Sequence, residues 1–204
     1  MKTAIKKPET RKNPHTTIIA TVQAPIGQTF EYIAPIYLPH IFPGTGPIAG
    51  IAGTSVDAGW NKAGLSRTIY FKDGTTTKET MQKWNAPSNF AYKNEEFTAP
   101  ALKHTAIRVE GEWFFTSLDE NTTKIEWTYR AIPKNFFARI FIRYVLMRFI
   151  TRMLQQAMDI SKHDLETGNL VGVQFPLAAA PSADQFAGQY ERSHSESEGI
   201  SVAL

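Results

Sequence analysis

The sequence contains no cysteine, so this chain forms no disulfide bond and offers no thiol nucleophile or cysteine metal ligand. Because disulfides are rare in reducing compartments, the absence of cysteine fits a cytoplasmic protein, and we expect one. No stretch of about 18 residues is apolar throughout and free of charge, so we predict no transmembrane helix. The basic N-terminus also lacks the continuous apolar segment of a secretory signal.

Motifs for common catalytic and cofactor chemistry are also missing. The sequence has no nucleophile elbow, phosphate-binding loop or dinucleotide-binding fingerprint. Its histidines are far apart, with no pair at metal-ligand spacing on one helix face: His15, His40, His104, His163 and His194. We therefore predict no metal site and no cofactor. His104 is the one histidine suited to act as a general base at a cavity mouth, and a solvated loop residue is the simpler interpretation.

Acidic side chains are scarce near the N-terminus, and basic side chains are scarce near the C-terminus. Residues 2–12 carry five basic side chains and one acidic one, whereas residues 183–204 carry four acidic side chains and one basic one. The formal net charge of +3 is too small to indicate a nucleic-acid partner. Since both ends have little to bury, we predict a flexible basic arm at 1–14, one domain at 15–167 and a loose tail at 168–204.

Between the two ends, the pattern alternates in the manner of strands joined by turns. Predicted strands are 15–23, 48–52, 65–71, 75–84, 90–97, 105–117 and 123–132. A short helix follows Pro25, a helical turn spans 37–42, and a loop opens at 99. In the last hairpin one face is apolar and aromatic, and it comprises Ile107, Val109, Trp113, Phe115, Ile125, Trp127 and Tyr129. An apolar sheet face has to be covered.

A helix predicted from Asn135 to Glu166 would cover the apolar face of the sheet. It contains no proline or glycine, its apolar residues recur three and four apart, and Asn135 and Gly168 suit its two caps. About 32 residues at ~1.5 Å each make a rod of roughly 48 Å, which crosses a small domain. The sequence therefore predicts an α+β fold in which an antiparallel sheet of six or seven strands wraps around a long C-terminal helix.

Three segments carry a resemblance to a known family. They are APIGQTFEYIAPI (24–36), GLSRTIYFKDGTTTKETMQKWNAPSNFAY (64–92) and TKIEWTYRAIP (123–133). In order and spacing they resemble the helix-grip fold of the START-like, or SRPBCC, superfamily, and within it the polyketide cyclase/dehydrase and lipid-transport proteins. The resemblance covers about residues 15–167. It implies a cavity between sheet and helix that holds apolar or amphipathic small molecules, in carriers, in sensors and in some enzymes.

An arginine and a glutamate stand out in the predicted 65–84 hairpin. If Lys72-Asp73-Gly74 forms its loop, Arg67 faces Glu79 and both share the inner face with Ile69, Phe71 and Met81. Burying both charges costs several kcal/mol per ion, so the pair would serve to fix the polar end of a ligand. A two-residue turn at 73–74 would instead shift the register and leave a plain cross-strand contact.

Other candidate ligand contacts are aromatic. Trp113, Trp127, Tyr129, Tyr92 and Phe90 would line the cavity, or would simply pack beneath the helix as core. Tyr144, on the predicted long helix, is a further candidate ligand contact.

The first half of the long helix carries more apolar surface than one covered stripe requires. From Lys134 to Met158 it has basic residues and no acidic one. The additional apolar surface of the helix would contact a cavity ligand, a partner subunit, the segment 170–180 folded back, or a membrane surface. The sequence does not determine the oligomeric state.

Taken together, these patterns favour binding, with or without transport, of an apolar or amphipathic molecule such as a lipid or polyketide-like compound. One alternative is a cyclase/dehydratase-type enzyme that uses Glu79 or a tyrosine as acid/base. The other is a peripheral membrane or partner-binding module that uses the basic helix.

Overall fold

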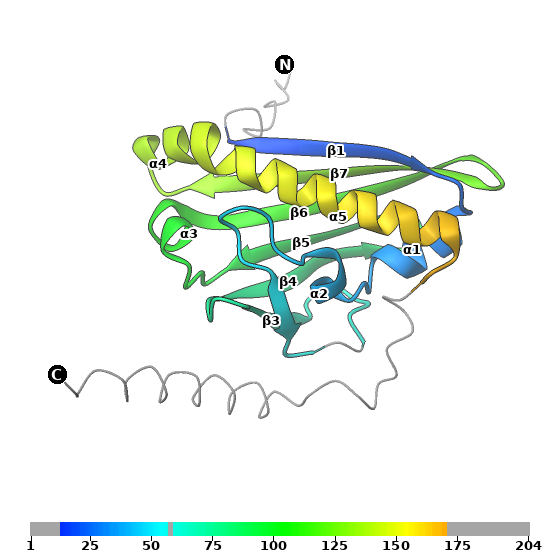
Figure 1. Cartoon of the computed structure of the whole chain (residues 1–204), viewed down its shortest axis with the longest axis horizontal. Helices are drawn as coiled ribbons and strands as arrows, with labels where there is room; N and C mark the ends of the chain where they lie inside the picture. The colour runs from blue at the N-terminus through cyan, green and yellow to red at the C-terminus, as the bar shows by residue number, and fades with distance from the viewer. Residues whose placement is uncertain (1–12, 57–58, 171–204) are drawn as a thin grey trace, which may run out of the picture.

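The structure is a computed structural model that describes residues 13–56 and 59–170. One seven-stranded antiparallel sheet, in the order β1-β7-β6-β5-β4-β3-β2, curves around a long helix (Figure 1). The strands are β1 (His15–Val22), β2 (Ile51–Thr54), β3 (Ser66–Phe71), β4 (Thr76–Asn85), β5 (Asn89–Glu95), β6 (Ala106–Asp119) and β7 (Thr122–Pro133). The predicted α+β class and sheet are confirmed.

The β3–β4 hairpin has the predicted register. Gly74 takes the left-handed conformation, with φ 79°, and the carboxylate of Asp73 accepts a hydrogen bond from the Thr75 backbone N–H over 3.0 Å. This loop chemistry sets Arg67 opposite Glu79 and Ile69 opposite Thr77. The side chains at 67, 69, 79 and 81 are therefore buried, because one face of the hairpin points toward the helix.

The β6–β7 hairpin is the longest in the sheet and corrects one prediction. Trp113 lies opposite Trp127 as expected, but Ile107 is 51% exposed. The register shifts between Ala106 and Arg108, so an extra residue is accommodated there as a bulge. Ala106 then takes the inward position and Ile107 turns out toward solvent.

The predicted C-terminal helix is continuous but not uniform. It consists of α4 (Phe136–Phe141), a π-helical turn η2 (Ile142–Leu146) and α5 (Met147–Thr167). The Asn135 side chain accepts a hydrogen bond from the Ala138 N–H over 2.9 Å, and Gly168 ends the helix with φ 72°, so both caps are confirmed. No helix within the described residues is long and apolar enough to span a membrane.

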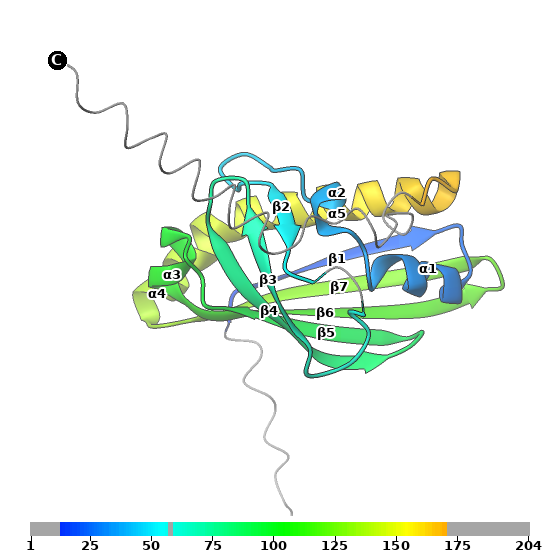
Figure 2. The ribbon, with the colours of Figure 1, turned by 90° about the horizontal axis from the view of Figure 1, so that it is seen from below.

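Shorter helices lie on the same side of the sheet as α5 (Figure 2). They are α1 (Ile26–Ile33), α2 (Leu38–Ile41) and α3 (Pro100–Thr105). The third replaces a predicted loop, since Pro100 sits in the first helical turn, where its missing N–H needs no partner. The buried Asp164 of α5 ties α1 and α2 to the long helix, because it accepts a hydrogen bond from the Tyr32 hydroxyl (2.5 Å) and contacts the His40 ring nitrogen Nε2 (2.8 Å).

The ends of the chain fall mainly outside the described residues. The predicted basic arm and the predicted return of 170–180 over the helix belong there, apart from residues 13, 14 and 170. Pro14 is buried, and its carbonyl accepts a hydrogen bond from the Ala131 N–H over 2.9 Å. The N-terminal segment thus joins the sheet at the end of β7 from which the long helix starts.

Candidate functional site

A cavity of about 390 Å³ separates the inner face of the sheet from α5. Side chains of β3 to β7 line one wall, and α2, α5 and the loop at 42–49 line the other. Most of the lining is apolar, and the volume lies within the ~300–1,000 Å³ typical of small-molecule sites. The loop is held in place on α5, since the Thr45 hydroxyl donates a hydrogen bond to the Gln156 side chain.

A buried ion pair lies in the sheet wall of this cavity. The Nε atom of Arg67 donates to an Oε atom of Glu79 over 2.7 Å, and the two residues are only 6% and 4% exposed. The Arg67 guanidinium also lies 4.3 Å from the ring centre of Trp60, which is buried. The inward orientation inferred from the hairpin loop is confirmed, because both members of the pair line the cavity.

Two tyrosines lie beside this pair. Burial raises the pKa of Tyr92 well above 10.0, and the neighbouring Tyr129 and Glu79 raise it further. Burial and the charge of Glu79 also raise the pKa of Tyr129. Both phenols are therefore protonated at neutral pH and are hydrogen-bond donors. Close by in the lining, the side-chain oxygen of Asn94 is buried and accepts no hydrogen bond from the described residues.

A glycine makes room for this polar group. Gly111 on β6 pairs with Tyr92 on one side and Tyr129 on the other. A Cβ atom at this position would lie 2.3 Å from Cζ of Tyr92, well inside van der Waals contact. The Tyr92 ring therefore crosses β6 in space that only glycine leaves open.

The aromatic lining is both wall and core. The rings of Trp113 and Trp127 stack with their centres 4.1 Å apart, and Phe42 approaches Trp127 edge-on at 6.3 Å. Trp113 and Trp127 are nearly fully buried, and both still line the cavity. Trp113 and Trp127 therefore both pack in the core and line the cavity.

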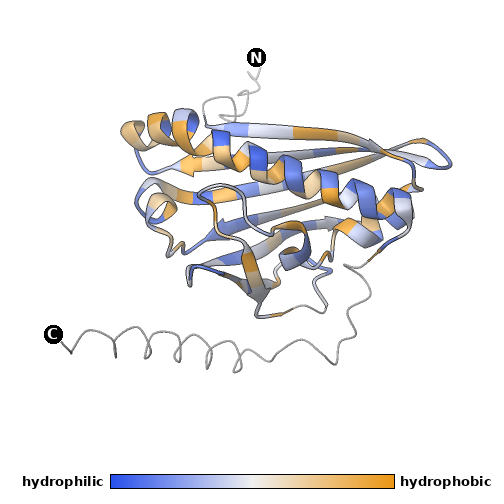
Figure 3. Cartoon of the chain, in the orientation of Figure 1, coloured by the Kyte–Doolittle hydropathy of each residue, from blue (hydrophilic) through white to orange (hydrophobic). Residues whose placement is uncertain are grey.

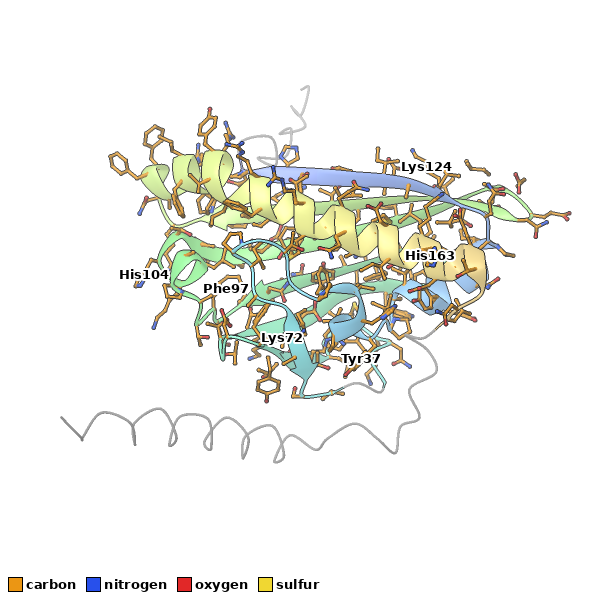
Figure 4. All side chains as sticks on the ribbon, in the orientation of Figure 1. Tyr37, Lys72, Phe97, His104, Lys124 and His163 are labelled. Carbon is orange, nitrogen blue, oxygen red and sulfur yellow. The ribbon has the colours of Figure 1, made fainter. Side chains whose placement is uncertain are left out.

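The cavity reaches the surface beside α3. Three of its lining residues are exposed, namely Pro47 in the loop, Asp73 in the β3–β4 turn and Ala101 on α3. Leu146 and Phe149 of the long helix also belong to the lining. His104 lies on α3 with its side chain exposed and is not part of the lining (Figure 4).

Most of the predicted contact residues come together in this cavity. Those in its lining are Arg67, Ile69, Phe71, Glu79, Phe90, Tyr92, Trp113, Trp127 and Tyr129. Met81 shares their face but is packed in the core outside the lining. Tyr144 is 66% exposed and lies outside the lining, because the long helix turns Leu146 and Phe149 inward instead.

Sequence reasoning missed three residues of the site: Trp60, Asn94 and Gly111. Asn94 could have been found, because it follows Phe90 and Tyr92 at the two-residue spacing of one strand face. Trp60 lies in an irregular segment, where no periodicity indicates its direction. Among the described residues, no group of histidine and acidic side chains has the arrangement of a metal site.

No protein-family model matches the chain, and no curated protein matches its sequence. Solved structures do match its fold. A norcoclaurine synthase point mutant from Thalictrum flavum, in complex with a transition-state analogue, has a TM-score of 0.56 at 15% identity, covering 77% of this chain and 96% of that one. A START superfamily protein from Mycobacterium smegmatis has a TM-score of 0.54 at 9% identity, covering 75% of this chain and 97% of that one.

A di-domain protein shares the fold as well. StfQ, a di-domain ARO/CYC protein of the steffimycin biosynthetic pathway, has a TM-score of 0.51 at 16% identity, with 76% of this chain and 45% of that one covered. At such identities the likeness is one of fold. The chain has the helix-grip fold of the START-like, or SRPBCC, proteins, as the three sequence segments implied.

Proposed function

We propose that this protein binds an amphipathic small molecule, such as a lipid or polyketide-like compound, in the cavity between sheet and helix, in the cytoplasm. The observation that carries the proposal is an apolar cavity in which the described residues place one cluster of polar side chains, namely the buried Arg67, Glu79, Tyr92 and Asn94 with the half-buried Tyr129. A purely structural core would gain nothing from such a cluster, since buried polar groups are expensive unless they are satisfied.

Burial of the ligand's apolar part supplies most of the binding free energy. A ligand that removes about 200 Å² of its apolar surface from water gains about 5 kcal/mol at ~25 cal/mol per Å². The polar cluster then orients the ligand rather than adding much affinity, because each of its hydrogen bonds replaces one made to water.

The charge balance of the cluster favours a neutral polar group on the ligand. Arg67 is already paired with Glu79, so the cluster has no unpaired cation for a carboxylate. The phenols of Tyr92 and Tyr129 are donors, and the Asn94 oxygen is a free acceptor. A hydroxyl, phenol or carbonyl group fits this set, because it can both accept from a tyrosine and, if it carries a proton, donate to Asn94.

The same features favour binding over catalysis. A phenol whose pKa is raised is a weaker acid at neutral pH, and one oxygen of Glu79 is engaged by Arg67. The cyclase/dehydratase alternative is tested by Glu79→Gln. An enzyme would lose turnover and keep its ligand, whereas a binding protein would change only in affinity.

The direct test is to fill the cavity. Ile69→Trp adds a large side chain to the lining, and Thr68→Trp on the same strand is its matched control because that side chain points to the other face. Titration with the neutral fluorescent probe N-phenyl-1-naphthylamine should show binding to the wild type and to Thr68→Trp. Ile69→Trp should bind at least tenfold more weakly. Equal binding by both variants would refute a cavity site.

A further inference from the structure

The N-terminal end of the long helix exposes a ridge of large apolar side chains. We call it the α4 ridge, and its members are Phe136, Phe137, Ile140, Phe141, Tyr144 and Val145. Phe137 alone is 80% exposed. Figure 3 shows α4 as an apolar helix end at the margin of the molecule, whereas the rest of the long helix alternates in hydropathy. Apolar groups gathered on so short a segment indicate a contact surface.

The half of the helix that carries the ridge has basic side chains and no acidic one. Lys134, Arg139, Arg143, Arg148 and Arg152 lie on or next to this half of the helix, and the next acid along the chain is Asp159. No acidic side chain among the described residues forms a salt bridge with Arg139, Arg148 or Arg152. The surface therefore combines exposed apolar rings with a positive border.

The basic N-terminal segment is attached at the same end of the molecule. Pro14 is hydrogen-bonded to Ala131, close before α4, and residues 2–12 add five basic side chains against one acidic one. Basic residues thus predominate in two separate parts of the sequence, the half of the helix that carries the ridge and the segment that precedes Pro14.

We propose that the α4 ridge docks on the surface of an anionic phospholipid bilayer. An interfacial helix needs an apolar face that enters the headgroup region and basic residues that meet the lipid phosphates, and α4–η2 supplies both. A second copy of the same face fits less well, since a symmetric contact would set arginine against arginine without an intervening acid. The helix enters the membrane surface and does not cross the bilayer.

The ridge also adjoins the cavity along the helix. Val145 ends the ridge, and the next residue, Leu146, lines the cavity. The π-helical turn η2 lies at this junction, and such turns interrupt the regular hydrogen-bond ladder of a helix. Docking of the ridge would therefore act next to a residue that lines the cavity.

The test is co-sedimentation of the full-length protein with vesicles of phosphatidylcholine alone and of phosphatidylcholine with about 30% phosphatidylglycerol, at low salt. Phe136→Ser/Phe137→Ser removes apolar contact, and Arg143→Glu/Arg148→Glu reverses charge. Phe114→Ser, an exposed ring on β6, and Lys62→Glu/Lys72→Glu are the matched controls. We expect the wild type to bind the anionic vesicles only. Each ridge variant should bind them at least about tenfold more weakly, because Phe136→Ser/Phe137→Ser loses apolar contact and each cation near an anionic surface contributes roughly a fivefold effect. Each control variant should bind like the wild type.

Indifference of the wild type to anionic vesicles would overturn the proposal, as would equal binding by the ridge variants. If Phe136→Ser/Phe137→Ser instead converts a dimer to a monomer, a second copy occupies the ridge. If vesicles bind only after removal of 171–204, that segment covers it. Either outcome also overturns the proposal. Ile69→Trp should keep vesicle binding, which separates this test from that of the cavity.

Discussion

Replacing Arg67 by methionine would leave the Glu79 carboxylate buried without its cation. Glu79 is 4% exposed, and the Arg67 Nε atom, 2.7 Å away, supplies the counter-charge of its carboxylate. Removing one partner of a buried ion pair typically costs about 3–5 kcal/mol. Loss of the contact between Arg67 and Trp60 adds to this cost.

The double variant Arg67→Met/Glu79→Leu should behave in the opposite way. With both charges removed and the volume roughly retained, the penalty of burying ions disappears. Its free energy of unfolding should be equal to that of the wild type or greater by up to about 4 kcal/mol. A small loss in the double variant beside a large loss in the single variant would show strong coupling between the two residues.

Urea unfolding followed by far-UV circular dichroism measures both values. Tryptophan fluorescence is unsuitable, since Trp60 contacts the mutated guanidinium directly. A single variant that loses less than about 1 kcal/mol would refute the reasoning, because the carboxylate would then be well solvated. The stable double variant should still bind an apolar probe, because burial of apolar surface supplies most of the binding free energy.

Three further predictions concern the polar groups of the fold. Folding raises the pKa of Tyr129, so the protonated phenol stabilises the folded state fully below about pH 10, and this stabilisation is lost as the pH rises further. Between about pH 10 and 12 the unfolding free energy of Tyr129→Phe should therefore fall less steeply with pH than that of the wild type, by up to about 1.4 kcal/mol per pH unit. Gly111→Ala should destabilise by about 1–3 kcal/mol in urea, since its Cβ would overlap the Tyr92 ring, and a neutral result would mean that the ring has room to move. Asp164→Ala should lower the unfolding free energy by about 1–3 kcal/mol, because the Tyr32 hydroxyl loses its buried acceptor; a change below about 1 kcal/mol would contradict that role.

Local chemistry explains why much of the fold could be predicted. The turn at 72–74 fixes the hairpin register through Gly74 and Asp73, and with period-two alternation this was enough to turn Arg67 and Glu79 inward. Asn135 and Gly168 bound the long helix for equally local reasons, since each satisfies backbone groups at its own end.

The errors arose where contacts distant in sequence decide the structure. A bulge at the start of β6 moved Ile107 out to solvent, and alternation alone gives no sign of an extra residue. Tyr144 lies in the π-helical turn η2 and is exposed, and the helical spacing of the sequence does not indicate such a turn. Trp60 reaches Arg67 from an irregular segment, which no repeating pattern describes.

The central claim is that the cavity holds an amphipathic molecule by its neutral polar end. Native mass spectrometry of the freshly purified protein, followed by organic extraction, tests it most directly. We predict one bound molecule per chain that carries a hydroxyl, phenol or carbonyl group, present in Thr68→Trp and absent from Ile69→Trp. A wild-type protein that carries no molecule and also takes up no apolar probe would contradict the claim.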